Sequence, residues 1–338
     1  MMLGRLAKMA PLLFGAVLAS CGTIGYAAKV GNTTISQAAL DHELQQVSSN
    51  KAFVALLKSN HSTVFAPGGK SYTITFVDSI LNRRITIDQI ENIESQLKLV
   101  PTSLESKLGT ALAEQSVGSQ SVFSQFSKNY QKQLISDTTA IVTLEAHLAH
   151  ATITNASVAA YYAAHRSQFV SYCASEILTG TPAQGQAALA QLKSGSSFAT
   201  VAAKYSQNTA TASSGGAIGC GTLANFLQSF GTSFASAVAA DPVNSPTQPI
   251  QLQQGWAVVE VTSKSQIPLS QANLLAVNNM ASAGQAKLNA AVTKAASNGS
   301  LSVNPIYGTV KKVGGTLQVV PSSTKQAITA QYFTPKSS

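Results

Sequence analysis

The chain has 338 residues, of which 45% are hydrophobic and only 10% are charged. Because globular domains have roughly 100–200 residues each, this length predicts about two domains. The apolar content is ample for a core and excludes wholesale disorder. The net charge is +9, and without residues 1–20, which contain Arg5 and Lys8, 20 basic residues remain against 13 acidic ones. This modest excess includes no dense basic run, so the sequence indicates no nucleic-acid partner.

The N-terminus has the pattern of an export signal. A charged start precedes an apolar run at residues 10–18, which is shorter than the about 20 residues that cross a bilayer. The run ends in Leu18-Ala19-Ser20-Cys21, which resembles the lipobox of bacterial lipoproteins. That resemblance implies cleavage before Cys21 and diacylation of its thiol, and two acyl chains are enough for stable anchoring. Ordinary cleavage after Ala27 or Ala28 is the alternative.

Residues 36–165 are predicted to be several amphipathic helices, which must bury their apolar faces against each other. The sequence therefore predicts a helical lobe in this part of the chain. In chain order we expect a hairpin at 27–36, a helix capped by Ser36, a loop at 59–71, a helix from Phe76 to Pro101, a helix begun by a Thr102–Glu105 capping box, a long helix at 121–149 and a short helix capped by Asn155.

Residues 168–265 have a different pattern, in which helices lie between two strands. This order predicts a compact α+β unit of about 100 residues. The predicted elements are a strand at 169–178, helices at 187–195 and 197–206, a loop at 207–222, a helix at 224–239 and a strand at 255–261.

A further helix is predicted at 270–297, followed by short strands at 301–320. One helix cannot bury its own apolar face, so we expect it to pack on the first lobe, which makes the α+β unit an insertion. The fold class is thus α+β. The predicted division is a signal peptide at 1–20, an N-terminal helical lobe at 21–166, an inserted domain at 167–266, a C-terminal helix and strands at 267–320 that complete the lobe, and a disordered tail at 321–338.

Several segments of the α+β unit resemble the parvulin class of peptidyl-prolyl cis-trans isomerases in order and spacing, apart from a few extra residues around 222–230. The matching segments are Ala174–Leu178, Leu192–Gly195 with Phe198, Tyr205-Ser206, Gly215–Gly219, Phe234 and Gly255–Val259. The flanking stretches at 30–44 and 303–308 resemble the ends of SurA/PrsA-type foldases. Together these resemblances imply a helical chaperone lobe with an inserted parvulin-like domain.

The resemblance also implies a site, at which this sequence departs from the family. Parvulins place two histidines, one Cys or Asp and a ring of apolar residues around the proline. In this chain Glu176 and Ala257 stand at the histidine positions and Asn208 at the Cys or Asp position. The family positions imply Ile218, Phe230 and Phe234 as proline-ring contacts and Gln254 as a polar group near the amide. From the residues alone, a place in the core is the alternative for Phe230 and Phe234. For Glu176, a strand position facing solvent is the alternative.

The three cysteines divide into Cys21, assigned to lipid, and the pair Cys173 and Cys220. An even pair in an oxidising compartment favours a disulfide, with two free thiols as the alternative. The resemblance favours the disulfide, because in the family these segments are neighbouring parts of one sheet.

Other motifs carry no chemistry of their own. His147 and His150 lie near Glu145 at helical spacing, but no further well-spaced ligand follows, so we interpret them as solvated helix residues and expect no metal site. Ser175 has no recognisable His/Asp relay, which argues against a hydrolase. Gly215–Gly219 is not followed by GK[ST], so it is not a phosphate loop.

The sequence thus suggests an exported, lipid-anchored foldase that binds unfolded exported polypeptides and requires neither ATP nor another cofactor. Because Glu176, Asn208 and Ala257 replace the family's polar residues, a non-catalytic holdase or assembly factor is the first alternative. A tethered solute-binding lipoprotein is the second, although the two-lobed α/β pattern of such proteins is missing. The sequence does not indicate an oligomeric state.

Overall fold

The computed structural model describes residues 25–297, 301–314, 316–323 and 327–328. The predicted signal peptide and Cys21 lie outside them. The chain divides into two compact units, which we call unit 1 (Met1–Gln89 with Val292–Ser338) and unit 2 (Ile90–Ala291). These bounds differ from the predicted domain division, which stays a prediction. Within the described residues, no helix combines the length and the apolar composition needed to cross a bilayer.

Unit 1 begins with the predicted hairpin, which turns at Gly31-Asn32, and the helix capped by Ser36 follows it. The two hairpin strands form a three-stranded antiparallel sheet in the order β2-β1-β8, so residues from both ends of the chain pair directly. The elements, with α3 and α14 continuing into unit 2, are β1 (Tyr26–Val30), β2 (Thr33–Ser36), α1 (Gln37–Ser49), α2 (Lys51–Ser59), β3 (Tyr72–Thr73), α3 (Ile74–Leu97), α14 (Gln285–Ala295), β8 (Leu301–Val303), β9 (Thr309–Val313), β10 (Thr316–Val320) and β11 (Ala327–Ile328).

The C-terminal strands are attached to the helices by hydrogen bonds. The Asn82 side chain, on α3, both donates to the carbonyl of Val319 (3.0 Å) and accepts from its N–H (2.7 Å), which fixes β10. Ala327 and Ile328 pair with Thr73 and Tyr72 of β3. The predicted disorder of 321–338 is therefore wrong at these two residues, because their backbones pair in register with β3.

The helical part of unit 2 differs from the prediction in three details. The long helix predicted at 121–149 is two helices, because the chain turns between Phe123 and Lys128. The short helix is capped by Thr154 in a capping box with Ser157, rather than by Asn155. The helix predicted at 270–297 is interrupted after Ser282. The elements are α4 (Ser103–Ser116), α5 (Gln120–Phe123), α6 (Lys128–Leu148), α7 (Asn155–Ala164), the 3-10 helix η1 (Arg166–Phe169) and α13 (Leu269–Ser282).

The helix that follows the α+β unit does return to the earlier helices, as predicted. Helix α13 packs on α4, α6 and α7, and its small buried residues Ala276 and Val277 join Leu108 and Val142 in one core. This packing makes the α+β unit an insertion between α7 and α13.

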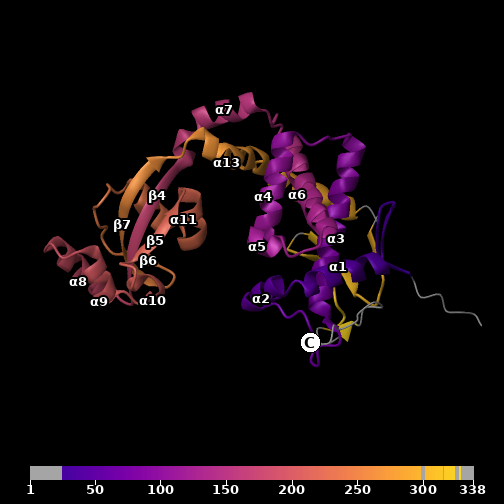
Figure 1. The fold of residues 1–338 in the computed structure, drawn as a ribbon, viewed down its shortest axis with the longest axis horizontal. Helices are drawn as coiled ribbons and strands as arrows, with labels where there is room; N and C mark the ends of the chain where they lie inside the picture. Colours follow the sequence, from indigo (N-terminus) through magenta and orange to yellow (C-terminus); the bar gives the residue numbers. More distant parts are fainter. Residues whose placement is uncertain (1–24, 298–300, 315, 324–326, 329–338) are drawn as a thin grey trace, which may run out of the picture. The chain divides into compact units, whose positions relative to one another are not determined.

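The inserted domain is a four-stranded antiparallel sheet in the order β5-β4-β7-β6 with helices on both faces (Figure 1). Helices α8 and α9 cover one face, and α11 and α12 cover the other. The loop predicted at 207–222 contains α10 and β5, and the helix predicted at 224–239 is two helices. The elements are β4 (Val170–Thr179), α8 (Pro182–Lys193), α9 (Phe198–Tyr205), α10 (Thr209–Ala212), β5 (Ala217–Gly221), α11 (Leu223–Phe230), α12 (Thr232–Ala240), β6 (Ile250–Leu252) and β7 (Gly255–Gln266).

The alternation of side chains along the central strands determines what each face contains. Ile177 and Val258, which are directly opposite in the register, pack with α8 and α9. Ala174 and Val261 point to the other face and pack with the phenylalanines of α11 and α12. Glu176 has the same parity as Ala174, so its carboxyl is directed to the face that α11 and α12 cover.

Candidate functional site

A cavity of about 620 Å³ opens on this face of the sheet. It lies between the end of β4, the α11–α12 junction and the β6–β7 turn, and the residue that precedes α10 also reaches it. Four of the six site residues predicted from the resemblance line it. The lining comprises Glu176, Leu178, Asn208, Leu227–Ser233 and Gln251–Gln254.

Glu176 is the acidic group of the cavity, and its side chain is almost completely withdrawn from water. The residue is 2% exposed, so the solvent-facing alternative is wrong. Its backbone N–H donates to the carbonyl of Gly216 (2.8 Å), and a Cβ on Gly216 would lie 2.6 Å from the Glu176 carbonyl oxygen. Gly216 also has φ +81°, so only glycine allows the chain to pass this close to β4.

Asn208 is directed at Glu176 by the turn that precedes α10. The Ser206 hydroxyl accepts from the backbone N–H groups of Leu178 (3.2 Å) and Asn208 (3.3 Å), which ties this turn to β4. Although Asn208 stands at the N-cap of α10, its side chain does not cap the helix. Its Nδ2 donates instead to Oε1 of Glu176 at 2.6 Å.

Burial raises the pKa of the Glu176 carboxyl above its ordinary value, and the hydrogen bond from Asn208 opposes that effect as the smaller cause. A carboxyl in such surroundings is shifted toward its neutral form, because the charged form loses its hydration. The two replacements of the family pattern therefore form one hydrogen-bonded pair in a weakly hydrated place.

The aromatic wall is made differently from the prediction. Phe230 lines the cavity and stacks on Phe234, with ring centroids 4.5 Å apart. Phe234 itself is fully buried and packs also on Phe226, so it supports Phe230 from beneath and is not a surface that a ligand touches. Ile218 packs against the same core from β5 and does not line the cavity either. The direct proline-ring contact predicted for Phe234 and Ile218 is therefore wrong.

Neutral polar side chains line the side of the cavity that the β6–β7 turn forms. Gln254 lies in the β6–β7 turn and is exposed, with Gln251 and Gln253 beside it. Ala257, at the second histidine position, is fully buried between Leu178 and Ile250 in the sheet. A methyl group there contributes packing and offers no hydrogen bond to a ligand.

Sequence reasoning missed the apolar residues Leu178, Leu227 and Leu252 at the cavity. Leu178 was detectable, because it follows Glu176 by two residues on a strand. Leu227 is 50% exposed on α11, next to the break that separates α11 from α12. Gly231 makes this break with φ +84°, a conformation that the periodicity of apolar residues does not reveal.

Cys173 and Cys220 form a disulfide between β4 and β5, where they are directly opposite in the register. Cys173 lies three residues before Glu176 on the same strand, so the crosslink joins the strand that carries Glu176 to the edge strand β5. It holds β5, whose residues are mostly exposed, against β4.

The other candidate groups stay apart from this cavity. His147 and His150 are exposed on or just after α6, whereas Glu145 is buried, and burial raises its pKa. Among the described residues, no group of three or more His, Cys, Asp or Glu side chains is arranged to hold a metal ion.

Residues 179–263 match the family model of the rotamase, or PPIC-type PPIase, domain. No curated protein matches the chain. Among solved structures, the foldase PrsA from Streptococcus pneumoniae is 14% identical, with 82% of this chain and 94% of that chain covered and a TM-score of 0.36. PrsA from Bacillus anthracis is 16% identical over 64% of this chain and 97% of that chain, with a TM-score of 0.35. A SurA-like chaperone from Campylobacter jejuni is 16% identical over 81% and 96%, with a TM-score of 0.28.

The family match confirms the parvulin resemblance of the inserted domain, and the mixed helix and sheet structure confirms the α+β class. PrsA and SurA-like foldases, the larger family that the flanking segments resemble, are also among the solved structures found.

Proposed function

We propose that this protein is an exported foldase whose inserted domain binds X–Pro segments of unfolded polypeptides and accelerates their cis–trans isomerisation. The observation that carries the proposal is the shared cavity: in a domain of the PPIC-type family, Glu176, Asn208, Phe230 and Gln254 surround one space of about 620 Å³. A space of this size is sufficient for a prolyl ring and its neighbouring residues.

The reaction requires no nucleophile and no metal. The X–Pro bond rotates over a barrier of about 18–20 kcal/mol, because the amide loses its resonance when it twists. The planar amide is more charge-separated than the twisted one, so weakly hydrated surroundings favour the twisted form. Phe230 and Leu178 would hold the ring, and the Glu176–Asn208 pair would keep the adjacent wall largely uncharged. Catalysis would then come from positioning and low polarity, without histidine.

The rival function is a holdase whose inserted domain binds peptides without catalysing rotation. One observation favours it. Asn208 already donates to Glu176, and Ala257 offers no hydrogen bond, so no side chain at these three family positions is free to bond the amide of a ligand. Both functions use the same cavity, and they differ in whether the amide barrier falls.

For the helical part we propose binding of unfolded chains. A cavity of about 410 Å³ in unit 1 supports this, since it can take side chains of an extended segment. Half of its lining is apolar, with α2 supplying Phe53 and Leu57, and the other half is polar. The lining residues are Val47, Phe53, Leu57, Phe76 and Ile80, with His61, Ser62, Thr63, Thr75 and Ser79. No residue of α2 is fully buried, so this helix keeps part of its apolar surface available.

We also propose that the protein is exported and anchored by diacylation of Cys21. The position of β1 supports cleavage before Cys21 rather than after Ala27 or Ala28. Both alanines are fully buried in β1, and the Ala27 carbonyl accepts from the N–H of Asn304 (2.9 Å). Cleavage after Ala27 or Ala28 would remove two or three of the five residues of a strand that holds the two ends of unit 1 together.

The test is an isomerisation assay with a proline peptide, using the chain from residue 22 onward, which contains every described residue. We expect catalysis that rises linearly with protein concentration. Uncatalysed rates at high protein concentration would end the enzymatic proposal. Suppressed aggregation of a denatured client under the same conditions would then leave the holdase as the function.

A further inference from the structure

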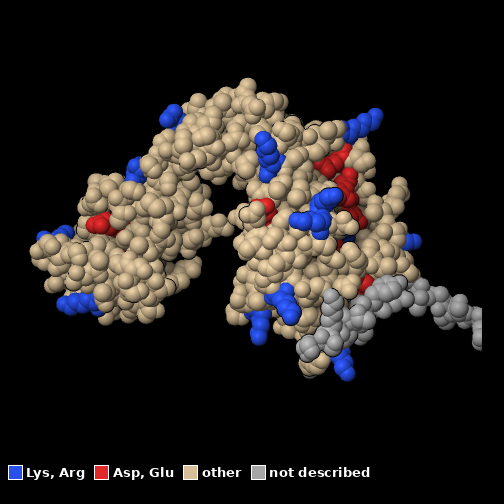
Figure 2. Space-filling view, in the orientation of Figure 1, with Lys and Arg blue, Asp and Glu red and all other residues tan. Residues whose placement is uncertain are grey.

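The net positive charge of the chain lies entirely in unit 1. This unit contains 13 Lys and Arg residues and 4 Asp and Glu residues, whereas unit 2 contains 9 of each. Most of the visible surface is neutral (Figure 2), so the few exposed charges decide what each unit attracts.

Burial strengthens this asymmetry, because the four acidic residues of unit 1 are withdrawn from the surface. Asp41, Glu43, Asp78 and Asp88 are 3%, 4%, 4% and 7% exposed. Arg83 and Arg84, which are both half-buried, bind Glu43 at 2.8 and 3.2 Å, and Arg84 also lies 4.0 Å from Asp88, so two cations and two carboxylates neutralise one another. In the described part of unit 1, the charged side chains that are exposed are Lys29, Lys51, Lys58, Lys70, Lys294, Lys311 and Lys312.

Unit 2 also exposes basic residues, namely eight lysines and Arg166, but acidic residues reach its surface as well. Glu91 is exposed, and Glu94, Glu114, Asp241 and Glu260 are half-exposed. The two units therefore differ in their surface carboxylates: in the described part of unit 1, none is exposed or half-exposed.

We propose that unit 1 binds the anionic surface of a lipid bilayer through its exposed lysines. Lysines near a membrane attract anionic headgroups, and no exposed carboxylate in the described part of unit 1 opposes them. On α2, Lys51 and Lys58 are seven residues apart and both exposed, so they point the same way with the small Ala55 between them.

The proposed anchor places the same unit close to the bilayer. Strand β1 begins at Tyr26, five residues after Cys21, and five extended residues span about 17 Å at most. Lys29, on β1, would then stay within reach of the headgroups. This step alone rests on the proposed lipidation, whereas the lysines act without it.

The test uses the unlipidated chain from residue 22 onward, so that it does not depend on the anchor. Sedimentation with vesicles of phosphatidylcholine and phosphatidylglycerol should carry the protein down, and vesicles of phosphatidylcholine alone should not. Binding should weaken steeply with added salt, because the salt screens exposed charges. Replacing Lys51 and Lys58 by Gln should weaken binding about fivefold for each lysine.

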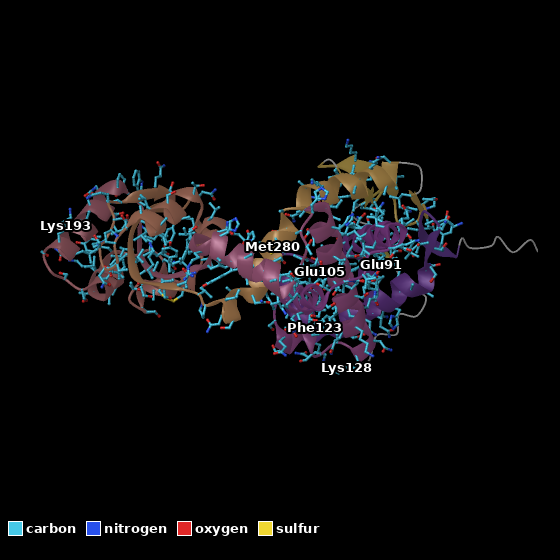
Figure 3. The ribbon with its side chains drawn as sticks, turned by 90° about the horizontal axis from the view of Figure 1, so that it is seen from above. Glu91, Glu105, Phe123, Lys128, Lys193 and Met280 are labelled. Carbon is cyan, nitrogen blue, oxygen red and sulfur yellow. A yellow bond between two sulfur atoms is a disulfide. The ribbon has the colours of Figure 1, made fainter. Side chains whose placement is uncertain are left out.

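The matched control is the double variant Lys193→Gln/Lys204→Gln in the inserted domain, where Lys193 is the last residue of α8 (Figure 3) and Lys204 lies on α9. It removes the same charge and should leave vesicle binding unchanged.

Equal loss in this control, or equal binding to both kinds of vesicle, would overturn the proposal. Binding to soluble polyglutamate without binding to anionic vesicles would overturn it too and would indicate acidic polypeptides as the partner. Failure to find lipid on Cys21 would remove the anchor but would leave this result standing.

Discussion

Asn208 Nδ2 and Glu176 Oε1 are 2.6 Å apart, at the wall of the cavity where the family pattern has a histidine and a Cys or Asp. The pair consists of two uncharged groups when Glu176 is protonated, and burial favours that state by raising the pKa of its carboxyl. Two positions at which this chain departs from the family pattern are therefore joined by a hydrogen bond.

We expect Glu176→Gln to preserve the proposed isomerase activity within about threefold, because an amide oxygen still accepts from Asn208 and the group stays neutral. Activity of the unchanged protein should fall as the pH rises through the pKa of Glu176, since ionisation brings charge and water to the site. The Gln variant should lose this pH dependence. The measurement is kcat/KM for a proline peptide as a function of pH.

The control for that prediction is Glu176→Ala, which leaves the amide of Asn208 without its acceptor. We expect at least a tenfold loss of kcat/KM and a loss of stability of about 1–3 kcal/mol. Equal activity of the Ala and Gln variants at every pH would show that the pair has no part in the reaction.

The stacked rings of Phe230 and Phe234 give a second prediction, because only the first ring is available to a ligand. Phe230→Ala should raise KM about tenfold, which corresponds to the loss of part of one apolar contact. Phe234→Ala should instead lower the free energy of unfolding by about 3–5 kcal/mol, as expected for a large cavity in a core. Denaturant unfolding followed by Trp256 fluorescence reports on the inserted domain alone, since Trp256 is the single tryptophan.

A reversed outcome would contradict the geometry of the site. If Phe234→Ala raised KM while the stability stayed the same, the ring of Phe234 would have to be accessible in solution. Leu227→Ala is a useful comparison, because Leu227 is half exposed at the same cavity and its loss should affect binding more than stability.

Much of the fold could be predicted from the sequence, because local signals coincide with packing. Ser36 and the Thr102–Glu105 box begin helices as predicted, since a side chain that accepts from a free N–H acts over three residues. Breaks within helical segments were missed. The periodicity of the apolar residues continues across Gly231, and only the positive φ of this residue separates the two helices.

The candidate site could also be predicted only in part. The family positions predicted Glu176, Asn208, Phe230 and Gln254 as site residues, and these four do line one cavity, because strand parity and motif order fix their places. They did not separate Phe230 from Phe234, which differ in burial, because burial depends on the angle between α11 and α12. The burial of Glu176 could not be predicted either, because it depends on how closely Gly216 passes β4.

The disulfide provides a third prediction. In the chain-entropy model, a crosslink between residues 47 positions apart stabilises the folded state by about 4 kcal/mol. Reduction, or the double variant Cys173→Ser/Cys220→Ser, should lower the free energy of unfolding of the inserted domain by a similar amount. Trp256 fluorescence in denaturant, with and without reductant, measures the difference, and the Ser variant should not respond to reductant.

Asp78 provides a prediction about pH and the stability of unit 1. It lies on α3, 4% exposed, and neither carboxyl oxygen has a hydrogen-bond partner. Burial raises its pKa from 3.8 to about 7. A carboxyl with a raised pKa stabilises the folded state fully below the unfolded value, and this contribution disappears as the pH rises through the folded value. Unit 1 should therefore lose a few kcal/mol of stability between about pH 4 and pH 7, with little further change from this group above that range.

Asp78→Asn isolates this effect, because the amide has nearly the same shape and does not ionise. The variant should become more stable than the unchanged protein as the pH rises from 4 to 7, and the difference should then stay constant. Hydrogen exchange of the α3 amides, measured by mass spectrometry on peptides, follows unit 1 without interference from the inserted domain. Glu94, whose pKa burial also raises to about 7, belongs to unit 2 and stays in the variant, so its contribution cancels in the comparison.

The control Glu114→Gln removes one carboxylate from α4 and should leave the pH profile of the α3 amides unchanged. Parallel pH profiles for Asp78→Asn and the unchanged protein would mean that the Asp78 carboxyl is ionised and solvated in the folded protein.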